Sequence, residues 1–210
     1  MLEYLERTPD CAPTIPVIVL DDPEHAVPLA RACAAGGVRI LEITLRTAAG
    51  LESIRRAAAE VPDVLVGAGT VTSPKDMAAV KAAGARFAFS PGFDESLVMA
   101  AADHDLAFVP GVMTPSEVMR AQNVGCSVMK LFPASVAGGI AMLKALAGPF
   151  PDARFCPTGG VDAASAPAYL ALPNVVAVGG SWITPSDAVT GGHWDRITEL
   201  ARAATALRRG

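Results

Sequence analysis

The chain alternates regularly between short apolar runs and alanine-rich segments with helical spacing. The apolar runs predict eight strands, at residues 14–20, 38–45, 64–70, 86–92, 106–111, 127–133, 153–160 and 175–181. The segments between and after them predict helices, at residues 23–35, 48–60, 74–83, 94–103, 115–123, 138–147, 162–171 and 193–208. Strands that alternate with single helices pair in parallel through βαβ crossovers.

Eight βα units in a chain of 210 residues favour one closed barrel. No linker or change of composition divides the chain, so we expect residues 1–210 to form a single-domain (β/α)8 TIM barrel. An open, doubly wound sheet is the alternative, because the sequence does not show whether the sheet closes. Residues 1–13 predict a short N-terminal helix that covers the N-terminal end of the barrel.

Composition and charge exclude several classes of partner. Hydrophobic residues make up 51% of the chain and the net charge is −4, whereas a nucleic-acid-binding face needs a basic excess. No run reaches the ~18 apolar residues of a membrane helix, and the N-terminus lacks the apolar core of a secretory signal. Cys11, Cys33, Cys126 and Cys156 show no metal or disulfide spacing. We therefore expect a cytoplasmic protein without nucleic-acid or membrane partners.

Polar residues and glycines gather where the predicted strands end. In barrel enzymes the chemistry lies at the C-terminal ends of the strands. The residues in question are Glu42, Arg46, Thr70, Ser90, Pro91, Lys130, Thr158, Gly159, Gly160, Gly179, Gly180 and Ser181.

Lys130 interrupts an apolar strand, and its position is the strongest chemical signal. Side chains alternate faces along a strand, so Lys130 shares a face with Val128, and Glu42 shares one with Ile40. One interpretation is a structural ion pair between Lys130 and Glu42. The other is an amine nucleophile, because desolvation disfavours the ammonium form and a free amine attacks a ketone to form a Schiff base.

The other polar residues suit an anionic substrate. Burial of Glu42 favours a role as a proton shuttle, with a structural partnership with Arg46 as the alternative. Arg46 can bind a carboxylate with two donors, or form a salt bridge at the rim. Two glycine pairs end the last two predicted strands, and the loops after those strands are where this architecture binds phosphate, although Gly-Gly also forms simple turns. Ser181 could add a hydroxyl to the phosphate site.

The histidines do not indicate a metal site. His25, His104 and His193 are not spaced as ligands of one ion. We therefore expect no metal and no cofactor.

Several stretches closely resemble the 2-keto-3-deoxy-6-phosphogluconate (KDPG) aldolase family, whose members also act on 4-hydroxy-2-oxoglutarate. The stretches are "HAVPLARACAAGGVRILEITLRT", "VGAGTV", "SPG", "KLFPA", "GPFPDARFCPTGGV" and "GGSW". The resemblance implies a (β/α)8 class I aldolase without a cofactor, a homotrimer, and a place in the Entner–Doudoroff route. It implies that a phosphorylated 2-keto acid is cleaved to pyruvate and glyceraldehyde 3-phosphate, with 4-hydroxy-2-oxoglutarate as a further substrate giving pyruvate and glyoxylate.

The resemblance also implies roles for individual residues. Lys130 would form the Schiff base, and Glu42 would act as general acid and base. Arg46 and Thr70 would bind the pyruvyl end. Thr158 would lie near the substrate hydroxyls, Pro91 and Phe132 would line the pocket, and Gly159, Gly160, Gly180 and Ser181 would hold the phosphate. Three alternatives stay open: an aldolase for the galactonate-derived epimer, a phosphate-binding barrel isomerase or synthase, and a non-catalytic sugar-phosphate sensor.

Overall fold

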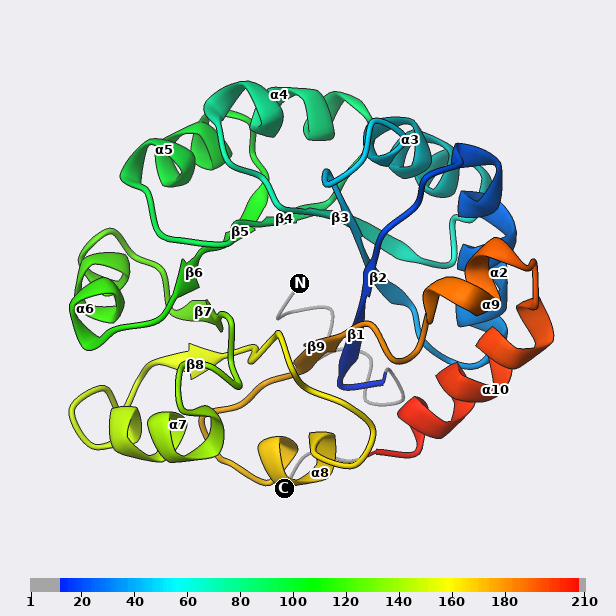
Figure 1. Cartoon of the computed structure of the whole chain (residues 1–210). Coiled ribbons are helices and arrows are strands. Elements are labelled where there is room, and N and C mark those ends of the chain that lie inside the picture. The colour runs from blue at the N-terminus through cyan, green and yellow to red at the C-terminus, as the bar shows by residue number, and fades with distance from the viewer. Residues whose placement is uncertain (1–11, 208–210) are drawn as a thin grey trace.

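Parallel strands form a curled sheet with helices along its outer side (Figure 1). The computed structural model describes residues 12–207, so the helix expected at residues 1–13 lies almost entirely outside the described residues. The strands are β1 (Thr14–Ile18), β2 (Ile40–Thr44), β3 (Leu65–Gly69), β4 (Phe87–Phe89), β5 (Ala107–Val109), β6 (Gly111–Val112), β7 (Val128–Leu131), β8 (Arg154–Phe155) and β9 (Val178–Gly180).

The strands pair in two groups. One sheet has the order β5-β4-β3-β2-β1-β9, and the other has the order β6-β7-β8. All the strand pairs are parallel, for example Glu42 opposite Gly67 in β2 and β3. A parallel bridge also pairs Thr158, beyond β8, with Gly179 of β9. This bridge places the free edges of the two sheets beside each other.

The helices connect successive strands, as the alternating pattern predicts. They are the 3-10 helix η1 (Pro23–His25) and the α-helices α2 (Ala26–Ala35), α3 (Gly50–Glu60), α4 (Pro74–Ala82), α5 (Glu95–Asp103), α6 (Pro115–Asn123), α7 (Gly139–Ala147), α8 (Ala166–Leu170), α9 (Ser186–Thr190) and α10 (Trp194–Thr205). Ser73 and Thr114 cap α4 and α6, and each makes a capping box with the acidic residue three positions on.

Three local features depart from the predicted elements. The fifth predicted strand is divided into β5 and β6 at Pro110, which has no N–H for a strand ladder. The helix predicted from residue 162 begins only at Ala166, because Asp162 and Ser165 form a turn in which the Ser165 backbone N–H donates to Asp162 Oδ1 at 2.8 Å. Helix α9 was not expected at all.

The inner side of the curled sheet is filled by side chains from most of the strands. One buried cluster unites Ile15, Ile40, Phe87, Phe89, Val109, Val128, Cys156 and Ala177. Gly67 leaves space for this cluster, since a Cβ atom there would overlap the Phe87 ring. Two further buried clusters lie between the strands and the outer helices. The inner cluster forms a packed floor for the polar residues at the C-terminal ends of the strands.

Candidate active site

Lys130 and Glu42 meet on the inner face of the sheet. Lys130 Nζ lies 3.0 Å from Glu42 Oε1, and the two residues are only 3% and 1% exposed. Their strand neighbours Ile40 and Val128 belong to the same inner cluster, so the predicted alternation of faces is confirmed. Removing either partner would leave a buried charge unpaired, which is strongly unfavourable. The contact also places a carboxylate close enough to exchange a proton directly with the amine.

Gly69 provides the space for this carboxylate. It is the last residue of β3, and a Cβ atom at this position would overlap the carboxyl group of Glu42. No signal in the alternation of polar and apolar residues marks Gly69, although the glycines of "VGAGT" indicate a close approach at this strand.

Two aromatic rings flank the Lys130 amine. The centroids of Phe89 and Phe132 are each 5.1 Å from Lys130 Nζ, a distance at which a cation interacts favourably with a ring face. Phe132 was predicted as a site residue, whereas Phe89 was not. The alternation in "RFAFS" places Phe89 on the same face as Phe87, but no polar residue on that face marks it as part of a site.

Cys156 belongs to the same inner cluster. Burial raises the pKa of its thiol to about 12, and the positive charge of Lys130 acts in the opposite direction. The thiol therefore stays protonated at neutral pH and does not compete with the amine as a nucleophile.

Arg46 and Thr70 form a second polar pair, at the ends of β2 and β3. Arg46 Nε donates to Thr70 Oγ1 at 3.3 Å, and the guanidinium group is exposed. Thr70 has a φ of 60°, a left-handed conformation that a β-branched residue rarely adopts. The backbone is thus strained at the point where the hydroxyl meets the guanidinium, and strain of this kind clusters at functional sites.

Gly159, Gly160 and Gly180 line a cavity of about 320 Å³. Gly159 and Gly160 both have positive φ values, 95° and 74°, so the turn after β8 depends on glycine. Gly180 is packed closely as well, since a Cβ atom there would overlap the Trp182 ring. The predicted residues that line this cavity are Arg46, Phe132, Thr158, Gly159, Gly160, Gly180 and Ser181.

The remaining predicted residues do not line this cavity themselves. Lys130 contacts the Phe132 ring, which lines the cavity, and Thr70 accepts a hydrogen bond from Arg46, which also lines it. Pro91 is placed differently, because it lines a separate cavity of about 200 Å³ with Val71, Thr72 and Ser90. Contact between Pro91 and a substrate therefore stays a prediction.

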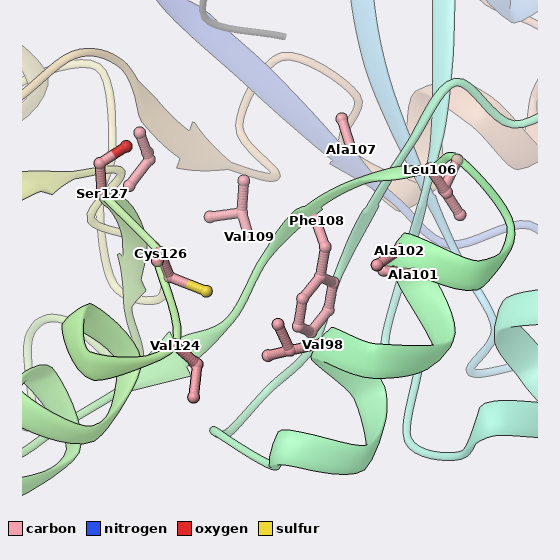
Figure 2. A pocket seen from close by; sticks show the side chains of 12 residues that line it. Val98, Ala101, Ala102, Leu106, Ala107, Phe108, Val109, Val124, Cys126 and Ser127 are labelled. Atoms are coloured by element: carbon pink, nitrogen blue, oxygen red, sulfur yellow. The ribbon is translucent and has the colours of Figure 1, made fainter.

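A different hollow lies at the opposite ends of the strands (Figure 2). It measures about 490 Å³ and includes Leu106 and Ala107 at the start of β5 and Ser127 before β7. Its lining is mostly aliphatic, with Phe108 and the half-buried Cys126 beside it. It holds no charged side chain, in contrast to the cavity that Arg46 lines.

Metal ligands do not gather anywhere in residues 12–207, where no three His, Cys, Asp or Glu side chains are arranged to hold an ion. Within the same range, no helix has the length and apolar character needed to cross a membrane.

Comparisons with known proteins agree with this geometry. The family described as "KDPG and KHG aldolase" matches residues 6–200. The 2-dehydro-3-deoxy-phosphogluconate aldolase of Pseudoalteromonas atlantica is 53% identical over 94% of this chain and 92% of its own. The KHG/KDPG aldolase of Escherichia coli is 51% identical over 91% of this chain and 90% of its own.

Solved structures give the same result. A KDPG aldolase from Legionella pneumophila, with pyruvate captured as a covalent carbinolamine intermediate, superposes with a TM-score of 0.90. It is 47% identical, and the match covers 93% of this chain and 95% of that one. A Zymomonas mobilis KDPG aldolase with 3-phosphoglycerate also gives a TM-score of 0.90, at 40% identity over 100% of this chain and 99% of that chain.

Proposed function

This chain belongs to the KDPG and KHG aldolase family, and from that premise we propose how its own residues perform a Schiff-base aldol cleavage. The substrate is 2-keto-3-deoxy-6-phosphogluconate, and the products are pyruvate and glyceraldehyde 3-phosphate. The observation that carries the proposal is the buried contact of 3.0 Å between Lys130 and Glu42, next to a cavity lined by glycines.

The amine first becomes a nucleophile. Lys130 gives a proton to Glu42, and the neutral amine attacks the C2 carbonyl carbon of the keto acid. The product is a neutral carbinolamine. Glu42 returns the proton to the C2 hydroxyl, which leaves as water, and an iminium cation remains on the Lys130 nitrogen. The covalent carbinolamine of pyruvate in the Legionella pneumophila relative is an adduct of this type.

The iminium then accepts the electrons of the C3–C4 bond. Glu42, now a carboxylate again, takes the proton of the C4 hydroxyl, directly or through one water. The bond breaks, the aldehyde leaves, and a neutral enamine stays on Lys130. Protonation of the enamine at C3 regenerates the iminium, and hydrolysis releases pyruvate. Water is largely excluded from the nitrogen, since Lys130 is only 3% exposed.

The ends of the substrate are held by separate groups. Arg46, supported by Thr70, binds the carboxylate with its planar donors. The backbone N–H groups of Gly159, Gly160 and Gly180, together with the Ser181 hydroxyl, bind the phosphate, because the absence of side chains lets the anion approach closely. Thr158 lies between these ends in the same cavity and faces the substrate hydroxyls. Phosphate binding remote from the reacting carbons helps to position them.

The wider biological setting follows from the family. We propose that the curled sheet closes into a (β/α)8 barrel of one domain. The bridge between Thr158 and Gly179 would join the two sheets on one side, and β5 and β6 would form a single fifth strand interrupted at Pro110.

The proposal extends to a homotrimer in the cytoplasm, to the Entner–Doudoroff route, and to cleavage of 4-hydroxy-2-oxoglutarate. Assays with both C4 epimers of the phosphorylated substrate distinguish the gluconate-derived from the galactonate-derived activity.

Reduction with borohydride in the presence of pyruvate tests the central step. We expect one reduced pyruvyl adduct per chain by intact mass, and peptide mapping should place it on Lys130. Lys130→Met, which keeps a straight apolar side chain, should give no adduct and no turnover. Lys144→Met is the control, because Lys144 is exposed on α7. An adduct in the Lys130→Met variant would remove Lys130 from the mechanism.

A further inference from the structure

We propose that Phe89 stabilises the positive charge that the Lys130 nitrogen carries in the iminium intermediate. The inference rests on the proposed function and adds a residue to it. Phe89 lies on β4, is 1% exposed, and has its ring centroid 5.1 Å from Lys130 Nζ. It does not line the cavity beside Arg46, so its action is on the nitrogen and not on the substrate chain.

The Phe89 ring is held by its neighbours. Phe87 packs edge-to-face against it, with ring centroids 5.6 Å apart and an angle of 88° between the planes. Phe87 is in turn accommodated by Gly67 of the neighbouring strand, where any side chain would overlap it. A ring fixed in this way acts without reorganisation when charge develops, which is the condition for effective electrostatic stabilisation.

The reaction uses this ring at one step in particular. The carbinolamine is neutral, and loss of its hydroxyl as water, with the proton from Glu42, converts it to the iminium cation. The nitrogen of both species is the former Nζ atom, so the charge appears at a point already close to the ring. A cation over an aromatic ring is favoured most where water is excluded, as it is around Lys130. Phe89 therefore favours the iminium over the carbinolamine.

Carbon NMR with [2-¹³C]pyruvate measures this balance directly. The labelled carbon is trigonal in the iminium and tetrahedral in the carbinolamine, so the two adducts give separate signals. We expect Phe89→Leu to lower the iminium-to-carbinolamine ratio about tenfold, which corresponds to about 1.4 kcal/mol. Phe155→Leu is the matched control, because Phe155 is equally buried but packs in the cluster on the outer side of β8. This control should keep the wild-type ratio.

Fluorinated phenylalanines at position 89 separate charge stabilisation from packing. Successive fluorine atoms weaken the negative ring face while the ring keeps nearly the same shape. We expect the ratio to fall stepwise with the number of fluorines at position 89 and to stay constant when they are placed at position 155. This series also covers the case in which Phe89→Leu does not fold.

The outcomes are distinct. A ratio that does not change with fluorination at position 89 overturns the role of Phe89, while the proposed function stands if pyruvate still forms its adduct on Lys130. If the wild-type protein forms no covalent adduct with pyruvate, the proposed function itself fails. A stepwise fall at position 89 alone supports the inference.

Discussion

Lys130 and Glu42 are 88 positions apart in the chain, yet Lys130 Nζ donates to Glu42 Oε1 at 3.0 Å. The contact joins β7 to β2, which belong to different sheets. Only the curl of the strands brings them together. An ion pair buried to this degree is costly to desolvate and rarely adds net stability, so its presence is better explained by chemistry than by folding.

Replacement of Glu42 tests its role as a proton shuttle. Glu42→Gln keeps the shape and one accepting oxygen but cannot take a proton, so we expect turnover to fall by roughly 10²–10⁴-fold. Borohydride trapping of pyruvate on Lys130 should persist, although more slowly. The control is Glu52→Gln, on an exposed face of α3 beside Arg55. A Glu42→Gln rate within a few-fold of wild type would exclude Glu42 as the acid–base group.

Replacement of Gly69 tests the space reserved for that carboxylate. In Gly69→Ala the new methyl group would overlap Glu42, which must rotate away from Lys130. We expect the cleavage rate to fall by about as much as in Glu42→Gln, roughly 10²-fold or more, with little change in KM for the 2-keto acid substrate. Gly148→Ala is the control, since a Cβ atom there meets only Ala145 O at 3.9 Å. Full activity in Gly69→Ala would mean that the carboxylate position is not critical.

The sequence predicted the positions of the reacting groups because strand alternation is a local property. Lys130 and Glu42 each follow the parity of their own strand, so the face on which each side chain lies was predictable, whereas the contact between them also depends on the curl of the sheet. The glycines after β8 were also predictable, because a Gly-Gly pair at the end of a strand indicates a turn, and in the structure both residues have positive φ values.

The contacts that depend on curvature were not predictable. Phe89 reads as ordinary core, and only the twist of the sheet decides that its ring faces a nitrogen on β7. The sequence shows a proline at position 110, but whether it divides the strand into β5 and β6 depends on the pairing with neighbouring strands. Pro91 was expected within the fourth strand, but β4 ends at Phe89, and the loop that follows it carries Pro91 into the lining of another cavity.

Thr70 offers a test of strain against binding. Thr70→Gly removes a β-branched residue from a φ of 60°, so the free energy of unfolding should rise by about 1 kcal/mol once the greater freedom of glycine in the unfolded chain is subtracted. It also removes the hydroxyl that accepts from Arg46, so KM for the 2-keto acid substrate should rise about tenfold. Denaturant unfolding and steady-state kinetics measure the two effects.

Two further variants separate these effects of Thr70. Thr70→Ser keeps the hydroxyl and should keep the wild-type KM. Asp105→Gly relieves the other positive φ of a non-glycine residue within residues 12–207, 47° at an exposed site, and it should leave KM unchanged. If Thr70→Gly binds pyruvate as well as the wild-type protein does, the hydroxyl has no part in holding Arg46.

Cys33 gives the protein a defined loss of stability in alkali. Cys33 lies on the buried face of α2, and burial raises the pKa of its thiol from its ordinary 9.0 to about 12. Between these values the unfolded chain releases the thiol proton and the folded chain keeps it, so the folded state loses stability as pH rises from 9 toward 12 and is unaffected below 9. A pKa shift of about three units corresponds to about 4 kcal/mol at most.

Urea unfolding at several pH values tests this effect. Between pH 9 and 12 the free energy of unfolding should fall more steeply with pH for the wild-type protein than for Cys33→Ala. Cys126→Ala is the control, because that thiol is only half-buried, and its removal should change the slope less. Equal slopes for wild type and Cys33→Ala would show that the thiol ionises as easily in the folded chain as in the unfolded one.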